Sequence, residues 1–136
     1  MSATRPTISA EAAQKIVDAA VAEANTMSVP ITVVVVDESG VLKAMLRMDG
    51  APLVSVETAT NKAYSAAAIG MPPDDFYAAI QADPAAVTEF GTRPGLALIA
   101  GGMPVLADGS LAGGVGVAGA MTAAEDRRIA EASIAG

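Results

Sequence analysis

Lys62 is the residue of this sequence that is best placed for chemistry at a buried site. It lies in an alanine-rich stretch without Pro or Gly, which predicts a helix. Steps of three and four residues connect it to small side chains on one helix face, namely Ser55, Ala59 and Ala66. Small neighbours let a backbone or a ligand come close, and an ammonium there needs an anionic partner. That partner is Asp37, Asp49 or the carboxylate of a substrate.

Two interpretations of Lys62 follow, and they differ in how much stability the protein loses when the charge is removed. If the aliphatic stem runs along a helix edge and the ammonium is solvated, Lys62→Met lowers the free energy of unfolding by about 1 kcal/mol or less. If the ammonium is half of a buried pair with Asp37 or Asp49, the substitution strands a carboxylate and costs about 3–5 kcal/mol. We predict the first, with Lys62 in a ligand pocket and dispensable for the fold.

Arg47, Asp49 and Tyr64 are further candidates for binding. Strand alternation places Arg47 and Asp49 on one face, where they can pair and shape the turn at Gly50. The guanidinium can instead bind a carboxylate or a propionate through two hydrogen bonds. Tyr64 is one of two phenols in the chain, and it is either an interface anchor or a contributor to the pocket.

Glycines form the remaining candidate site, at Gly101, Gly102 and Gly116. Glycine within a strand allows close approach of a helix or of a ligand. We expect close packing here, and approach of a ligand can hold together with it. Gly114, Gly116 and Gly119 also spell G-x-G-x-x-G. The pattern is no dinucleotide fingerprint, because the sequence after it predicts a single helix without the further strand and acidic residue of such a unit.

The composition excludes several classes of function. The chain has no Cys and no His, which excludes disulfides, Cys/His zinc sites, thiol nucleophiles, the Ser-His-Asp triad and imidazole bases. Carboxylates occur in pairs only at predicted turns and helix starts, so we assign no metal. A net charge of −7 with eight Lys and Arg argues against nucleic acid or an anionic membrane as partner.

Hydropathy points to self-association. Hydrophobic residues make up 52% of the chain and charged residues 17%, against about 25% charged in an average soluble domain. Apolar surface in excess of what one core needs predicts a homo-oligomer. No leader peptide or membrane-spanning run is evident, so we expect a cytoplasmic protein, and the length predicts one domain over residues 1–136.

The candidate residues must be positioned by an α+β fold. The periodicity of apolar residues and the positions of turn-forming residues predict helices and strands in the order α β β α α β β β α. The helices are expected over 9–27, 53–69, 71–81 and 122–136, and the strands over 31–36, 41–49, 96–100, 103–107 and 111–118. Residues up to Gly95 after the third helix give no regular pattern. Hairpin connections predict a five-stranded antiparallel sheet flanked by helices in three layers.

Five short motifs occur in the order known from one protein family: VDESGVL at 36–42, RMDGA at 47–51, NKA at 61–63, GGMPV at 101–105 and GGVGVAG at 113–119. The chain thus resembles the GlcG/HbpS family, which also forms the C-terminal part of PduO-type corrinoid adenosyltransferases. The resemblance implies a profilin-like α+β fold, homo-oligomers and, in several members, binding of haem or a related tetrapyrrole. Ala118 stands where members usually carry Ser.

The function expected from residues and resemblance together is that of an oligomeric small-molecule-binding accessory protein. Its pocket should lie between the sheet, the Lys62 helix and the Gly101–Gly119 region. Haem is the ligand that the resemblance implies, and the absence of His and Cys excludes haem held by imidazole. Two alternatives remain: an enzyme acting on a small carbonyl or carboxylate compound, with Lys62 as base or Schiff-base amine assisted by Tyr64 or Asp49, and a purely structural subunit.

Overall fold

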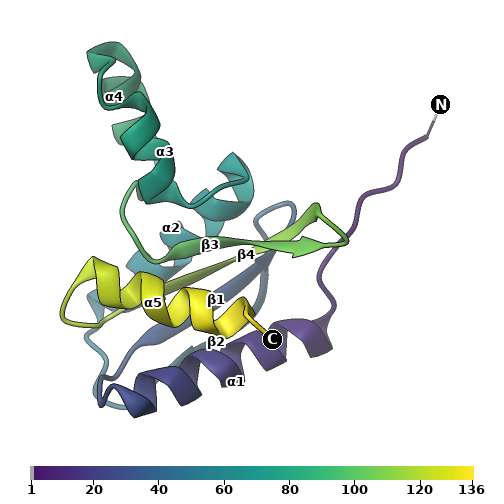
Figure 1. The fold of residues 1–136 in the computed structure, drawn as a ribbon, viewed down its shortest axis with the longest axis vertical. Helices are drawn as coiled ribbons and strands as arrows, with labels where there is room; N and C mark the ends of the chain where they lie inside the picture. The colour runs from purple at the N-terminus through teal and green to yellow at the C-terminus, as the bar shows by residue number, and fades with distance from the viewer. Residues whose placement is uncertain (1) are drawn as a thin grey trace.

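The computed structural model describes residues 2–136 and is an α+β protein (Figure 1). Within that range the elements are α1 (Ala10–Thr26), β1 (Thr32–Asp37), β2 (Leu42–Arg47), α2 (Val54–Ile69), α3 (Pro73–Ile80), α4 (Pro84–Gly91), β3 (Gly102–Ala107), β4 (Ser110–Ala118) and α5 (Ala123–Ile134). The predicted α+β class is confirmed.

The sheet is antiparallel throughout, with the strand order β2-β1-β4-β3. Strands β1 and β4 form its centre, and Val34 of β1 lies opposite Gly116 of β4. Four consecutive valines, Val33 to Val36, are buried because the sheet is covered on both faces. The outer strand β2 is largely exposed.

Helices cover the two faces unequally. Helices α1 and α5 pack on one face, where Val33, Val35, Val115 and Val117 join the larger hydrophobic cluster. Helix α2 packs on the other face, where its alanines contact Val34 and Val36 in a smaller cluster. Helices α3 and α4 extend away from this body as an arm (Figure 1). The fold therefore has three layers.

The prediction of a fifth strand over residues 96–100 is wrong, and the sheet has four strands. The Ala97 N–H donates to Ser65 Oγ of α2 at 2.8 Å rather than to a strand. Gly101 then turns the chain with a φ of +127°, and its carbonyl accepts from the Val117 N–H at 2.8 Å. Sheet pairing consequently begins only at Gly102.

Two other features differ from the sequence-based expectation: an additional helix, α4, and the end of strand β2. Helix α4 occupies a stretch without a regular apolar pattern, because Asp83 Oδ1 accepts the N–H groups of Ala85 and Ala86 and caps the helix. Strand β2 ends at Arg47, so Asp49 lies in the following turn.

Candidate functional site

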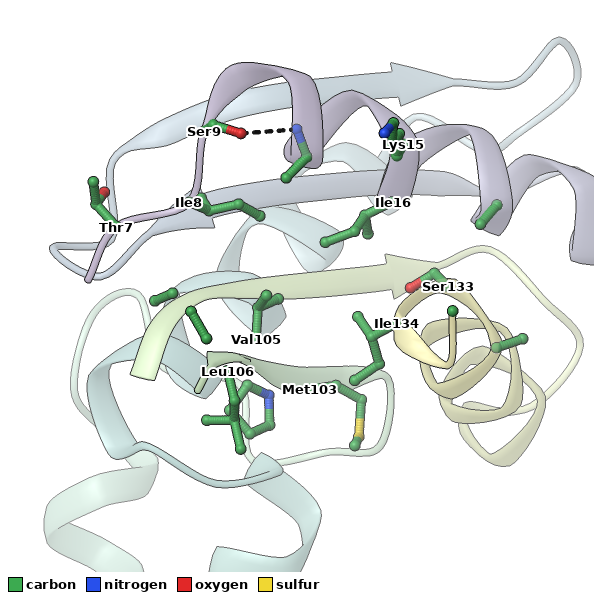
Figure 2. A pocket seen from close by; sticks show the side chains of 17 residues that line it. Thr7, Ile8, Ser9, Lys15, Ile16, Met103, Val105, Leu106, Ser133 and Ile134 are labelled. Carbon is green, nitrogen blue, oxygen red and sulfur yellow. Dashed lines mark hydrogen bonds between the residues drawn. The ribbon is translucent and has the colours of Figure 1, made fainter. Parts of the chain in front are cut away.

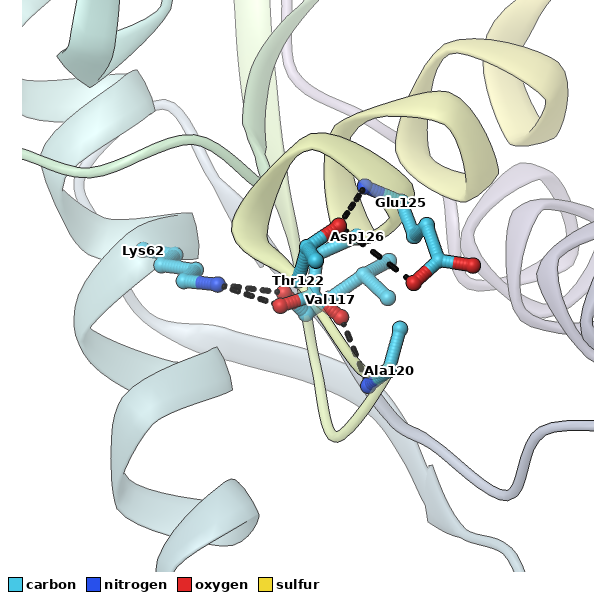
Figure 3. A network of polar contacts seen from close by, with 6 residues as sticks. All are labelled: Lys62, Val117, Ala120, Thr122, Glu125 and Asp126. Carbon is cyan, nitrogen blue, oxygen red and sulfur yellow. Dashed lines mark hydrogen bonds and ion pairs between the residues drawn. The ribbon is translucent and has the colours of Figure 1, made fainter.

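Lys62 is fully buried and forms an ion pair with Asp126 of α5 (Figure 3). Its Nζ lies 3.0 Å from Asp126 Oδ2 and donates to the carbonyl oxygen of Val117 at 2.9 Å. The two side chains are 1% and 7% exposed. The pair therefore ties α2 to α5 across the end of β4, through residues 64 positions apart in the chain.

Asp126 is itself held by its surroundings. Its Oδ1 accepts the Ala120 N–H at 2.9 Å, and Thr122 caps the helix by accepting the Glu125 N–H (Figure 3). Burial raises the pKa of the Asp126 carboxyl above its ordinary value, while the neighbouring Lys62 ammonium and the Ala120 N–H oppose that rise. Both carboxylate oxygens are thus engaged within the protein.

The expected environment of Lys62 is wrong in two respects. The lysine does not run out to water, since it is 1% exposed. Its partner is Asp126 rather than Asp37 or Asp49, because Asp37 Oδ1 instead accepts the N–H groups of Ser39 and Val41 in the β1–β2 turn.

Gly101, Gly102 and Gly116 do lie around Lys62. A methyl group on Gly101 would lie 2.7 Å from Lys62 Nζ, and one on Gly102 would lie 2.5 Å from the Lys62 carbonyl oxygen. A methyl group on Gly116 would overlap the carbonyl oxygen of Ala59 and lie 2.5 Å from the Ala63 nitrogen. Gly116 and Gly102 thus let the α2 backbone rest directly on β4 and β3, and Gly101 leaves room for the Lys62 side chain. This is the close packing that the glycine run predicts.

Arg47, Asp49 and Tyr64 are not part of this cluster. Arg47 donates from Nε and Nη2 to the Ala51 carbonyl oxygen, at 2.9 and 2.7 Å. It thereby holds the turn at Gly50 without the pairing to Asp49 that we expected; no such pair occurs within residues 2–136. The Tyr64 ring packs against Gly40 and Gly95. Participation of these three residues in binding stays a prediction.

A small cleft of about 320 Å³ lies where the sequence analysis places the pocket. Lys62, Ser55 and Thr58 line it from α2, and residues 118–123 with Asp126 line the opposite side. The ammonium beneath it already has two partners. The volume is at the lower end of the range for ligand pockets.

A larger cavity lies on the other face of the sheet, and we name it the α1–α5 groove (Figure 2). It has a volume of about 940 Å³ and runs between α1, β3 and α5. Its lining is mainly aliphatic: Ile8, Ala12, Ile16, Ala19, Pro104, Val105, Leu106, Ala107, Ala112, Ala132 and Ile134. The remaining lining residues are Thr7, Ser9, Lys15, Met103, Ser133 and Gly136.

Sequence reasoning missed this groove and the pairing role of Asp126. The groove unites residues from the N-terminal segment, β3 and the C-terminal helix, and no local pattern links those segments. Asp126 carries a partial signal, since it lies in the first turn of a capped helix. That local role explains the residue without requiring a distant lysine.

Comparison with known proteins identifies the family. A sequence model described as "Haem degrading protein HbpS-like" matches residues 8–135. The chain belongs to this HbpS-like family. The resemblance drawn from the short motifs is thereby confirmed.

Three individual proteins show how far the similarity extends. A double mutant of HbpS from Streptomyces reticuli has a TM-score of 0.89 and 33% identity over 98% of this chain and 89% of that one. A structure described as a PduOC:heme complex has a TM-score of 0.85 and 29% identity, covering 95% and 94%. The corrinoid adenosyltransferase PduO of Citrobacter freundii is 33% identical over 118 residues, which are 86% of this HbpS-like chain and 35% of the enzyme.

No helix within residues 2–136 is both long and apolar enough to cross a membrane.

Proposed function

We propose that this HbpS-like chain is an oligomeric accessory protein that binds a tetrapyrrole in the α1–α5 groove. The observation that carries the proposal is the groove itself, which combines a volume of about 940 Å³ with a mainly aliphatic lining. Pockets for cofactors are concave, largely apolar and of this size. The relative described as a PduOC:heme complex supports the ligand class.

The residues of the groove fit the macrocycle better than they fit a strongly ligated iron. Aliphatic side chains from the α1 side and from β3 and α5 face the cavity (Figure 2). Among residues 2–136, Met103 is the sulfur-containing side chain that lines the groove, and its thioether would hold an iron there. Bound haem would supply a redox-active metal; the chain itself supplies the apolar contacts and excludes water.

Haemin should therefore bind through apolar contact, without the low-spin spectrum of bis-imidazole ligation. Ala12→Trp places an indole in the groove and should weaken binding at least about tenfold, equivalent to about 1.4 kcal/mol. Ala22→Trp is the matched control, since Ala22 lies on an exposed part of α1 outside the groove lining. Absorbance titration measures both variants. Equal binding by the two variants, or a bis-imidazole spectrum, would contradict the proposal.

Self-association is the second part of the proposal. The outer strand β2 exposes three large apolar side chains, Leu42, Met45 and Leu46, at 54%, 41% and 41%, and Val41 just before it is 59% exposed. An apolar edge strand of this kind tends to pair with another chain. We expect sedimentation velocity to give a species of at least twice 13.4 kDa, and Leu42→Lys combined with Met45→Lys to reduce its size. A wild-type protein that sediments only near 13.4 kDa would contradict the assignment.

Amine chemistry by Lys62 is less well supported than binding. The Lys62 ammonium donates to Asp126 and to the Val117 carbonyl oxygen. A Schiff base at Nζ would keep at most one N–H, which could not donate to both the Asp126 carboxylate and the Val117 carbonyl oxygen. The geometry therefore favours a structural role for this lysine.

A further inference from the structure

We infer that the α1–α5 groove selects ligands that combine an apolar body with a carboxylate, and that Lys15 binds this carboxylate at the rim. The inference rests on the proposed function and specifies its ligand class. Among residues 2–136, Lys15 is the one charged side chain that lines the groove. An amphipathic acid is therefore the ligand whose charge and apolar surface match the lining.

The polar groups of the groove differ in their availability. Ser9 Oγ accepts the Ala12 N–H at 3.1 Å and caps α1, and Ser133 Oγ donates to the Ala130 carbonyl oxygen at 2.6 Å. These hydroxyls serve the helices on either side of the groove. They give no charge to balance that of an acid.

Lys15 is held only weakly by the protein. Its Nζ lies 3.5 Å from Glu11 Oε1, in a pair whose side chains are 77% and 83% exposed. Exposed pairs four residues apart on a helix contribute little and are screened by salt. Glu11 does not line the groove. The Lys15 ammonium can thus turn from Glu11 to a ligand carboxylate at the rim.

The contact between Lys15 and the ligand carboxylate is a partly exposed ion pair. Such a contact changes affinity by up to about fivefold. Because the charges lie at the rim, the preference for an acid should also decrease as salt is added. Apolar contact sets most of the affinity, and Lys15 distinguishes the free acid from its ester.

The experiment compares protoporphyrin IX with its dimethyl ester, which has the same ring without the two carboxylates. Pigment fluorescence is titrated with wild type, Lys15→Gln and Lys43→Gln. Lys43 is an exposed lysine of β2 outside the groove, and its replacement changes the net charge by the same amount. We expect wild type and Lys43→Gln to bind the acid about fivefold more tightly than the ester. Lys15→Gln should bind the two pigments equally, with ester affinity unchanged.

Equal binding of acid and ester by wild type would overturn the inference, and so would a preference that survives in Lys15→Gln. Either result leaves the proposed function intact, since the ring still binds. If neither pigment binds wild type, the proposed function fails and the role of Lys15 fails with it.

Discussion

Lys62→Met is expected to destabilise the folded protein by about 3–5 kcal/mol. The substitution keeps the apolar stem but leaves the Asp126 carboxylate, 7% exposed, without its cation. It also removes the donor to the Val117 carbonyl oxygen at the end of β4. Urea unfolding of the variant beside wild type measures the loss.

Neutralising the partner should recover part of that loss. In Lys62→Met combined with Asp126→Asn, the amide oxygen can still accept the Ala120 N–H while the buried negative charge is gone. The double variant should therefore be more stable than Lys62→Met alone. A loss below about 1 kcal/mol for Lys62→Met, or a double variant less stable than the single one, would show that the pair does not stabilise the fold.

Gly116→Ala is expected to cost about 1–3 kcal/mol, because the added methyl group has no space. It would overlap the Ala59 carbonyl oxygen of α2, and backbone atoms can give way only if α2 moves off β4. Gly91→Ala is the matched control: it lies in α4, and an added methyl group there meets no atom within 4 Å. The control should be neutral or more stable, since alanine favours helix by up to about 1 kcal/mol. Comparable losses in both variants would contradict the packing role of Gly116.

Much of the fold could be predicted where local pattern and tertiary structure agree. The strand over 31–36, its hairpin connection to the next strand and the helix that begins near residue 122 are such cases. The prediction of a strand over residues 96–100 was wrong. An apolar run is typical of a strand, but it does not show whether a neighbouring strand has a free edge to pair with. The sequence predicts no helix between residue 81 and Gly95, although Asp83 followed by Pro84 is also a pattern with which helices begin.

The sites were harder to predict for a different reason. The type of Lys62 and its small neighbours indicated a confined ammonium, but nothing local distinguishes Asp126 from the other carboxylates as its partner. The glycines around Lys62 were identified by type, and only the contact with α2 shows that they serve close packing. The α1–α5 groove forms where residues 7–19 and 132–136 come together beside β3. The periodicity of apolar residues within one segment does not predict contacts between such distant segments.

The measurement that tests the central claim most directly is a crystal structure of the protein grown with protoporphyrin IX. The pigment should lie between α1, β3 and α5, against Met103 and Ile134, with a propionate near Lys15 at the rim. A pigment bound on another face of the protein, with the α1–α5 groove free, would contradict the assignment of the site.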